Sequence, residues 1–328
     1  MIISKTPVRI SFFGGGTDYP DHFIKNGGGV LSTSIDKYIF VTVKPSGGIS
    51  EHKYRVAYSR LEQCDDLEEI QHPVVREVIR FLHITQSLEI NVVSDLPART
   101  GIGSSSSFTV GLLHALHALK GNMVSKQQLA SEAVHIEQVV LKERVGVQDQ
   151  YAAAFGGFNQ IEFSKTGNIV LNPVCIPNGR KVELQSNLIM FYTGISRFAH
   201  KVLEEQIQKT KDNAIVNDLA RMHQMVEDGL QILCTGKDLR LFGELLHEGW
   251  MAKRSLSSAI SNTFLDEIYE NARKAGAIGG KLLGAGGGGF FVFFAEPGKR
   301  GAVRKALSEF PEVSFTLEND GTRIIHFS

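Results

Sequence analysis

Leu96–Ser107 reads LPARTGIGSSSS and connects a strand-like stretch, Leu88–Val93, to an apolar stretch typical of a buried helix that runs to Lys120. Glycines let a backbone turn sharply and approach an anion closely. A helix that begins at the serines would point its free N–H groups and the positive end of its dipole at that anion. A serine-rich loop with an ordinary helix N-cap is the alternative. The order strand, loop and buried helix favours a phosphate-binding loop, with a nucleoside triphosphate as the natural ligand.

Two other phosphate-binding motifs do not fit this chain. No segment has the Walker pattern of Gly, four residues, Gly, Lys and a hydroxyl residue. The dinucleotide fingerprint is matched at Gly284, Gly286 and Gly289, but Phe290–Phe294 follows and predicts a strand. A Rossmann site needs a helix at that point, so a nicotinamide-binding oxidoreductase is disfavoured.

Length and charge limit the other possibilities. A chain of 328 residues favours two domains, and turn signals between Pro173 and Gly179 suggest domains 1–182 and 183–328. The 35 basic and 35 acidic residues cancel, so nothing indicates a nucleic-acid partner or an anionic membrane surface. No secretory signal and no apolar run long enough to span a membrane is visible. We therefore expect a cytoplasmic protein.

Hydrophobic periodicity and turn residues predict alternating strands and helices. In the first half, strands are predicted at Val8–Phe13, Val30–Ile35, Ile39–Lys44, Tyr54–Ala57, Asn159–Phe163 and Ile169–Leu171, and further helices at Pro73–His83 and Lys126–Arg144. In the second half, strands are predicted at Leu188–Tyr192, Phe290–Phe294, Val313–Leu317 and Thr322–Phe327, and helices at Asp238–Arg254 and Thr263–Ala275.

Pro7–Tyr19, which reads PVRISFFGGGTDY, combines a strand, three glycines, a hydroxyl and a carboxylate. Arg9 lies in a hydrophobic strand, where an unpaired guanidinium is costly to bury, so we expect it to meet an anion or a carboxylate. A surface arginine on an edge strand is the alternative. Asp18 could accept hydrogen bonds from sugar hydroxyls or could cap a turn.

Two later segments also carry candidate residues. Glu137 lies on the predicted helix before Gly146-Val147-Gln148-Asp149-Gln150, where Asp149 is either a positioned carboxylate or a turn residue. Gly279–Gly289 contains four consecutive glycines between two apolar strands. Such a run loses backbone entropy on folding, which suggests a need for close backbone approach, although a flexible hairpin loop remains an alternative.

Together, the Pro-x-Arg and Gly-Gly-Gly-Thr-Asp-Tyr segment, the serine-rich loop and Leu-Gly-Ala-Gly-Gly-Gly-Gly resemble the GHMP small-molecule kinases. Within that family the motifs are most similar to the heptose 7-phosphate kinase branch, which also resembles the fucokinase-type sugar kinases. Galactokinases carry a Glu-His pair in place of Gly15 and Gly16, and this difference argues against galactose as the substrate.

The resemblance implies roles for individual residues. Asp149 matches the catalytic aspartate, Arg9 the cation near the transferred phosphoryl group, and Glu137, with Ser105, the magnesium ligands. The implied nucleotide-binding residues are Pro97, Arg99, Gly101, Gly103, Ser104, Ser105, Ser106 and Ser107. The implied substrate-binding residues are Gly15, Gly16, Thr17, Asp18, Gly286, Gly287 and Gly288.

The resemblance also implies an α+β fold with a ribosomal-protein-like N-terminal domain, a ferredoxin-like C-terminal domain and an active site between them. The implied activity is transfer of a phosphoryl group from ATP, with Mg²⁺, to the anomeric hydroxyl of D-glycero-D-manno-heptose 7-phosphate. A kinase of an unphosphorylated sugar such as fucose and a catalytically inactive sugar sensor are the alternatives. Basic residues that could receive an acceptor phosphate are Arg99, Arg197, Lys201, Lys253 and Arg254.

Overall fold

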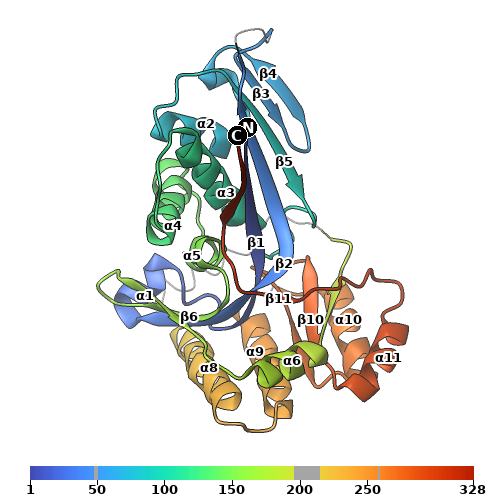
Figure 1. Cartoon of the computed structure of the whole chain (residues 1–328). Coiled ribbons are helices and arrows are strands. Elements are labelled where there is room, and N and C mark those ends of the chain that lie inside the picture. Colours follow the sequence, from blue (N-terminus) through green and yellow to red (C-terminus); the bar gives the residue numbers. More distant parts are fainter. Residues whose placement is uncertain (48–50, 196–214, 258) are drawn as a thin grey trace.

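The computed structural model describes residues 1–47, 51–195, 215–257 and 259–328, and in these ranges the chain forms two β-sheets with helices packed on them (Figure 1). The larger sheet has the path β12-β1-β2-β5-β3-β4, with β11 and β6 also paired to β2 and with β7 paired to β6. Its strands are β1 (Ile2–Phe13), β2 (Gly28–Pro45), β3 (Tyr54–Ala57), β4 (Leu61–Cys64), β5 (Leu88–Ser94), β6 (Phe158–Phe163), β7 (Ile169–Pro173), β11 (Leu317–Glu318) and β12 (Arg323–Phe327).

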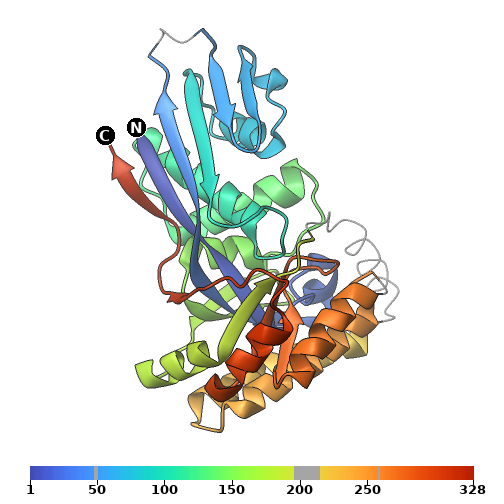
Figure 2. The same cartoon turned by 90° about the vertical axis from the view of Figure 1, so that its right-hand side faces the viewer.

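Helices α2 to α5 lie together on one face of the larger sheet, as Figures 1 and 2 show. The helical segments of this part are α1 (Pro20–Asn26), η1 (Leu67–Glu69), α2 (Pro73–Phe81), α3 (Ser104–Leu119), α4 (Lys126–Val134), η2 (His135–Val140) and α5 (Gln148–Phe155). The central helix α3 packs on β1 and β2. Gly111 allows this close contact, because a Cβ at that position would lie 2.7 Å from Thr6 Oγ1. The packing of α3 on β1 sets where the serine-rich turn lies.

The second sheet has the order β8-β10-β9. Its strands are β8 (Leu188–Tyr192), β9 (Gly279–Leu282) and β10 (Phe290–Phe294), and the helices near it are α6 (Asn178–Asn187), α8 (Val216–Cys234), α9 (Arg240–Leu256), α10 (Thr263–Lys274) and α11 (Pro297–Ala306). Every residue of β10 is buried, which explains its uninterrupted apolar sequence. Helix α9 packs closely on β9, because Gly279 has no side chain and a Cβ there would lie 1.9 Å from Gly243 O.

The end of the chain returns to the larger sheet, where β12 pairs with β1 in the antiparallel direction. The domain division predicted after residue 182 falls within α6 and stays a prediction. None of the helices in the described ranges is long and apolar enough to cross a membrane.

Two of the predicted elements differ from the structure. The helix predicted for Lys126–Arg144 changes to π-helical hydrogen bonding at His135 and ends at Val140. The strand predicted for Val313–Leu317 is mostly irregular, and only its last residue belongs to β11. The segment runs from one sheet to the other: Val313 N donates to Met190 O in β8, whereas Asp36 N in β2 donates to Thr316 O.

Candidate active site

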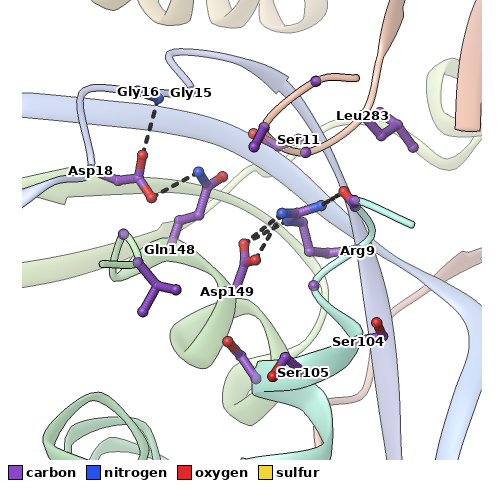
Figure 3. Close-up of a pocket in the computed structure, with 18 of the residues that line it drawn as sticks. Arg9, Ser11, Gly15, Gly16, Asp18, Ser104, Ser105, Gln148, Asp149 and Leu283 are labelled. Atoms are coloured by element: carbon purple, nitrogen blue, oxygen red, sulfur yellow. Dashed lines mark hydrogen bonds and ion pairs between the residues drawn. The ribbon is translucent and has the colours of Figure 1, made fainter. Parts of the chain in front are cut away.

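A cavity of about 330 Å³ lies where the end of β1, the serine-rich turn, the segment before α5 and the glycine-rich loop meet (Figure 3). Most of the site residues predicted from the sequence line it. These are Arg9, Gly15, Gly16, Asp18, Arg99, Gly101, Gly103, Ser104, Ser105, Ser106, Glu137, Asp149, Gly286 and Gly288. Pro97, Thr17, Ser107 and Gly287 are not among the described residues that line it.

The serine-rich turn places the N-terminus of α3 at the cavity. The N-cap residue Gly103 has a φ of 75° and Gly101 a φ of 82°, which is the left-handed region that favours glycine. The first serines of the helix line the cavity, where the orphan N–H groups of a helix N-terminus attract anions. Ser107 instead holds α3 against β1, because its Oγ donates to Pro7 O at 2.8 Å.

Thr17 likewise has an internal role. Its buried Oγ1 donates to Gly14 O at 2.8 Å and to Gly29 O at 3.0 Å. These bonds fix the turn of three glycines that follows β1. Thr17 therefore supports the cavity wall formed by Gly15 and Gly16 without lining the cavity itself.

Arg9 and Asp149 form an ion pair in the middle of the cavity. Arg9 Nε donates to Asp149 Oδ1 at 2.8 Å and Nη2 donates to Oδ2 at 2.9 Å, while Nη1 donates to Gly101 O at 2.7 Å. The arginine side chain is 6% exposed and that of the aspartate is 26% exposed. The prediction that Arg9 meets a carboxylate or an anion is therefore confirmed, and Asp149 supplies the carboxylate.

The Asp149 carboxylate faces the serine-rich turn. A Cβ at Gly103 would lie 3.3 Å from Asp149 Cγ. Asp149 comes from the first turn of α5, and the contact between α5 and α3 brings it to the N-terminus of α3. A group held at that N-terminus would therefore lie next to this carboxylate.

Asp18 lies on the other side of Asp149, as Figure 3 shows. Its Oδ1 accepts a hydrogen bond from Gly16 N at 3.1 Å and its Oδ2 accepts one from Gln148 Nε2 at 2.9 Å. Burial, followed by the charge of Asp149, raises the pKa of the Asp18 carboxyl. Asp18 thus caps the glycine turn and also lines the cavity, so the two interpretations of this residue are compatible.

Glu137 is a buried carboxylate beside the first turn of α3. Its Oε2 accepts hydrogen bonds from Ser106 Oγ at 2.9 Å and from Gln150 Nε2. Its Oε1 is buried and has no hydrogen-bond partner among the described residues. Burial raises the pKa of Glu137 to about 7. An oxygen with these properties fits a cation ligand, because a buried acceptor without a partner is costly.

A magnesium ion is compatible with this arrangement. Mg²⁺ is usually held by one or two carboxylates together with substrate phosphates and water. In the described ranges no group of three or more His, Cys, Asp and Glu residues could form a metal site of its own. Glu137 and the exposed Ser105 would therefore supply part of a shell that a phosphate chain completes.

The glycine-rich loop between β9 and β10 packs backbone to backbone against its neighbours. A Cβ at Gly289 would lie 2.2 Å from Thr100 O, and a Cβ at Gly286 would lie 2.8 Å from Ile260 Cα. Both glycines have positive φ angles. The predicted close approach of backbone is confirmed, and its partners lie within the chain itself.

Sequence reasoning missed two polar residues that line the cavity, Ser11 and Lys281. Ser11 follows Arg9 by two positions along β1, and that period of two was the available signal. Lys281 lies within the glycine-rich segment Gly279–Gly289, and its Nζ donates to Phe12 O at 2.8 Å.

The five basic residues predicted as candidate receptors for an acceptor phosphate differ in their positions relative to the cavity. Lys253 and Arg99 line the cavity. Arg254 does not line it, and its Nη2 donates to Asp266 Oδ2 at 2.7 Å. Arg197 and Lys201 lie outside the described residues.

Comparison with known proteins identifies related kinases. A family model described as "GHMP kinases N terminal domain" matches residues 71–157, and one described as "GHMP kinases C terminal" matches residues 227–313. The chain is 31% identical to D-glycero-alpha-D-manno-heptose 7-phosphate kinase of Campylobacter jejuni, over 97% of both proteins. It is 24% identical to the bifunctional fucokinase/GDP-fucose pyrophosphorylase of Arabidopsis thaliana, over 96% of this chain and 32% of that protein.

Solved structures extend the likeness to the fold. A structure described as a D-glycero-D-manno-heptose 1-phosphate kinase from Bacteroides thetaiotaomicron superposes with a TM-score of 0.82 at 26% identity and covers 100% of both chains. The galactokinase of Lactococcus lactis complexed with galactose gives a TM-score of 0.73 at 20% identity, covers 98% of this chain and 94% of that one, and shares the fold. These matches confirm the α+β architecture with N- and C-terminal domains that the motifs predicted.

Proposed function

The chain belongs to the GHMP kinase family, and we propose that it transfers the γ-phosphoryl group of ATP to the anomeric hydroxyl of D-glycero-D-manno-heptose 7-phosphate. Members of this family are ATP-dependent phosphotransferases with an alcohol group as the acceptor. The heptose assignment is supported by the 31% identity to the Campylobacter jejuni enzyme over almost the whole length of both proteins.

One observation carries the catalytic assignment: the Asp149 carboxylate is held by Arg9 next to the N-terminus of α3. In this proposal the serine-rich turn binds the triphosphate through its N–H groups and hydroxyls. The acceptor hydroxyl approaches from the Asp18 side. Asp149 then lies between the two substrates, in the position that a general base needs.

Asp149 has the acceptor capacity that this role requires. Each carboxylate oxygen has two lone pairs, and Arg9 occupies one on each oxygen. A sugar hydroxyl can donate to a remaining lone pair. As the sugar oxygen forms its bond to the γ-phosphorus and the bond to ADP breaks, Asp149 takes the hydroxyl proton, and ADP leaves with the electron pair of the broken bond.

Arg9 orients this base and adds positive charge where it is needed. Phosphoryl transfer passes through a loose transition state in which charge is spread over the phosphoryl oxygens, so alignment and charge neutralisation supply most of the catalysis. When bound with ATP, Mg²⁺ supplies further neutralisation of the β- and γ-phosphate oxygens. Glu137 and Ser105 are the residues of this chain that we propose as its ligands.

A kinase of an unphosphorylated sugar is the second candidate, favoured by the likeness to the Arabidopsis thaliana fucokinase protein. A sugar sensor without catalysis is disfavoured, because Arg9, Glu137 and Asp149 all line one cavity. The two candidate kinases differ in the acceptor sugar and in whether that sugar carries a phosphate group.

The test is ADP release with a panel of free and terminally phosphorylated hexoses and heptoses, with the phosphorylated carbon identified by ³¹P nuclear magnetic resonance. We expect the highest kcat/KM with heptose 7-phosphate and a new phosphate at the anomeric carbon. Preference for a free sugar would support the second candidate. Absence of acceptor-dependent ADP release would support the sensor.

A further inference from the structure

We propose that Ser11, Lys253 and Lys281 form the subsite that binds the phosphate group of the acceptor sugar, an inference that rests on the kinase function proposed above. The three residues come from β1, α9 and β9, so the subsite joins the larger sheet to the elements packed around the smaller one. All three line the cavity that contains Arg9 and Asp149.

The two lysines carry buried charge that lacks a counterion. Lys253 is 7% exposed and Lys281 is 6% exposed. Lys253 Nζ donates to Gly284 O, and Lys281 Nζ donates to Phe12 O at 2.8 Å. In the described ranges no carboxylate lies within ion-pair distance of either ammonium group. The guanidinium of Arg9, in contrast, forms an ion pair with the carboxylate of Asp149. An ammonium group has three N–H donors, so each lysine keeps donors for a ligand.

Burial of the two ammonium groups lowers the pKa of both lysines. Burial, together with the charge of Arg9, lowers the pKa of Lys253 to about 8. Burial, together with the charges of Lys253 and Arg9, lowers the pKa of Lys281 well below its usual value. The charge of Asp18 partly offsets that of Lys253, although the two groups form no ion pair. A phosphate dianion between the two lysines would compensate both charges.

Ser11 provides an independent observation. Its Oγ is buried and has no hydrogen-bond partner among the described residues. The side chain lines the same cavity, two residues after Arg9 on β1, and Figure 3 shows both side chains at this cavity. A buried hydroxyl without a partner indicates a missing ligand atom, and a phosphate oxygen is an acceptor that suits it.

The position of these residues favours the acceptor over the nucleotide. In Figure 3 Ser104 and Ser105 lie on one side of the Arg9–Asp149 pair, while Ser11, Gly16 and Asp18 lie on the other. The charges that act on Lys253 are those of Arg9 and Asp18, and those that act on Lys281 are Lys253 and Arg9. Lys281 Nζ donates to Phe12 O, the residue after Ser11, and Asp18 acts on Lys253. We therefore assign the two lysines to the Asp18 side of the cavity, where the remote end of a sugar would lie with its anomeric hydroxyl at Asp149.

The test compares Lys253→Met, Lys281→Met and Ser11→Ala with wild type. Lys305→Met is the matched control, because Lys305 is exposed on α11 and its loss changes the net charge equally. KM is measured for D-glycero-D-manno-heptose 7-phosphate, for the same heptose without phosphate, and for ATP. Binding of heptose 7-phosphate without nucleotide is measured by calorimetry, and thermal unfolding checks that each variant is folded.

We expect each lysine variant to weaken the binding of heptose 7-phosphate on the order of 10- to 100-fold, as for lost hydrogen bonds to a charged group. The KM values for the free heptose and for ATP should change less than about twofold, and Ser11→Ala should give a smaller loss than either lysine variant. Equal losses with both heptoses, or a raised KM for ATP with unchanged heptose 7-phosphate binding, would overturn the subsite.

Failure of the subsite and failure of the proposed function give different results. Lysine-dependent binding of heptose 7-phosphate by a wild-type protein that does not phosphorylate it overturns the function and supports the subsite. Phosphorylation of heptose 7-phosphate that is insensitive to both lysines overturns the subsite alone. Absence of binding by the wild-type protein overturns both.

Discussion

Gly101 and Gly284 touch backbone to backbone where the serine-rich turn crosses the glycine-rich loop. A Cβ at Gly284 would lie 2.3 Å from Gly101 Cα, and a Cβ at Gly101 would lie 2.3 Å from Leu283 O. The φ angle is 82° at Gly101 and 74° at Gly284. Two segments far apart in the sequence are thus held together at the rim of the cavity, with no space for a side chain between them.

Gly284→Ala should therefore destabilise the protein and weaken nucleotide binding. The added Cβ forces the loops apart and the φ is unfavourable for alanine, so we expect a loss of about 1–3 kcal/mol in the free energy of unfolding. The matched control is Gly301→Ala, because Gly301 is on α11 and a Cβ there meets nothing within 4 Å. Urea unfolding and the KM for ATP are the measurements. Identical behaviour of the two variants would show that the contact is dispensable.

Asp149→Asn should remove the general base. We expect kcat to fall by about 10²–10⁴-fold, while the affinity for ATP stays within about twofold of wild type. The substitution also leaves the buried Arg9 guanidinium without its ion pair, so thermal unfolding is measured in parallel. A folded variant with wild-type kcat would refute the assignment.

Glu137→Gln should raise the Mg²⁺ concentration needed for half-maximal activity by at least about 10-fold, because the ligand loses its charge. Ser106 Oγ and Gln150 Nε2 can still donate to the amide oxygen of glutamine, so the variant should fold. Titration of activity with Mg²⁺ at saturating ATP is the measurement. An unchanged Mg²⁺ requirement would remove Glu137 from the set of proposed ligands.

Lys253 should make stability increase with pH in alkaline solution. Its pKa is about 8 in the folded protein and 10.5 when unperturbed. Below pH 8 the group is charged in both states and its burial cost is fully present. Between pH 8 and 10.5 the unfolded chain binds more protons, so the contribution of this group to stability rises with pH, by about 3 kcal/mol in total.

The measurement is the free energy of unfolding of wild type minus that of Lys253→Met, from urea unfolding between about pH 7 and pH 10. Methionine has no ionisable group, so this difference removes the titrations that Lys253 does not affect. It retains the titration of Lys253 together with its effect on the pKa of Lys281. We expect the difference to increase with pH across this window. A flat difference would contradict a Lys253 that is buried without an ion pair.

Local patterns in the sequence were sufficient for much of the fold. The uninterrupted apolar sequence of β10 after a run of glycines, and the change from glycines to serines where α3 begins, are local signals that act within a few residues. The π-helical end of the segment after α4 and the irregular course of residues 313–316 were not predictable in this way. The π-helical segment keeps local hydrogen bonds, such as Leu141 N to Ile136 O, and the hydrophobic pattern does not distinguish them from α-helical ones. Residues 313–316 depend on distant partners, Met190 and Asp36.

The sequence by itself determined which segments carry phosphate-binding and acid–base chemistry, because glycine, serine and carboxylate residues have the same chemical capacity wherever they lie. Only the tertiary structure decided that Arg9 pairs with Asp149 across 140 residues, and that Lys281 and Ser11 face the same cavity. The physical reason is that buried charges and backbone contacts gain their energy from partners brought together by packing, and sequence distance carries no information about that packing.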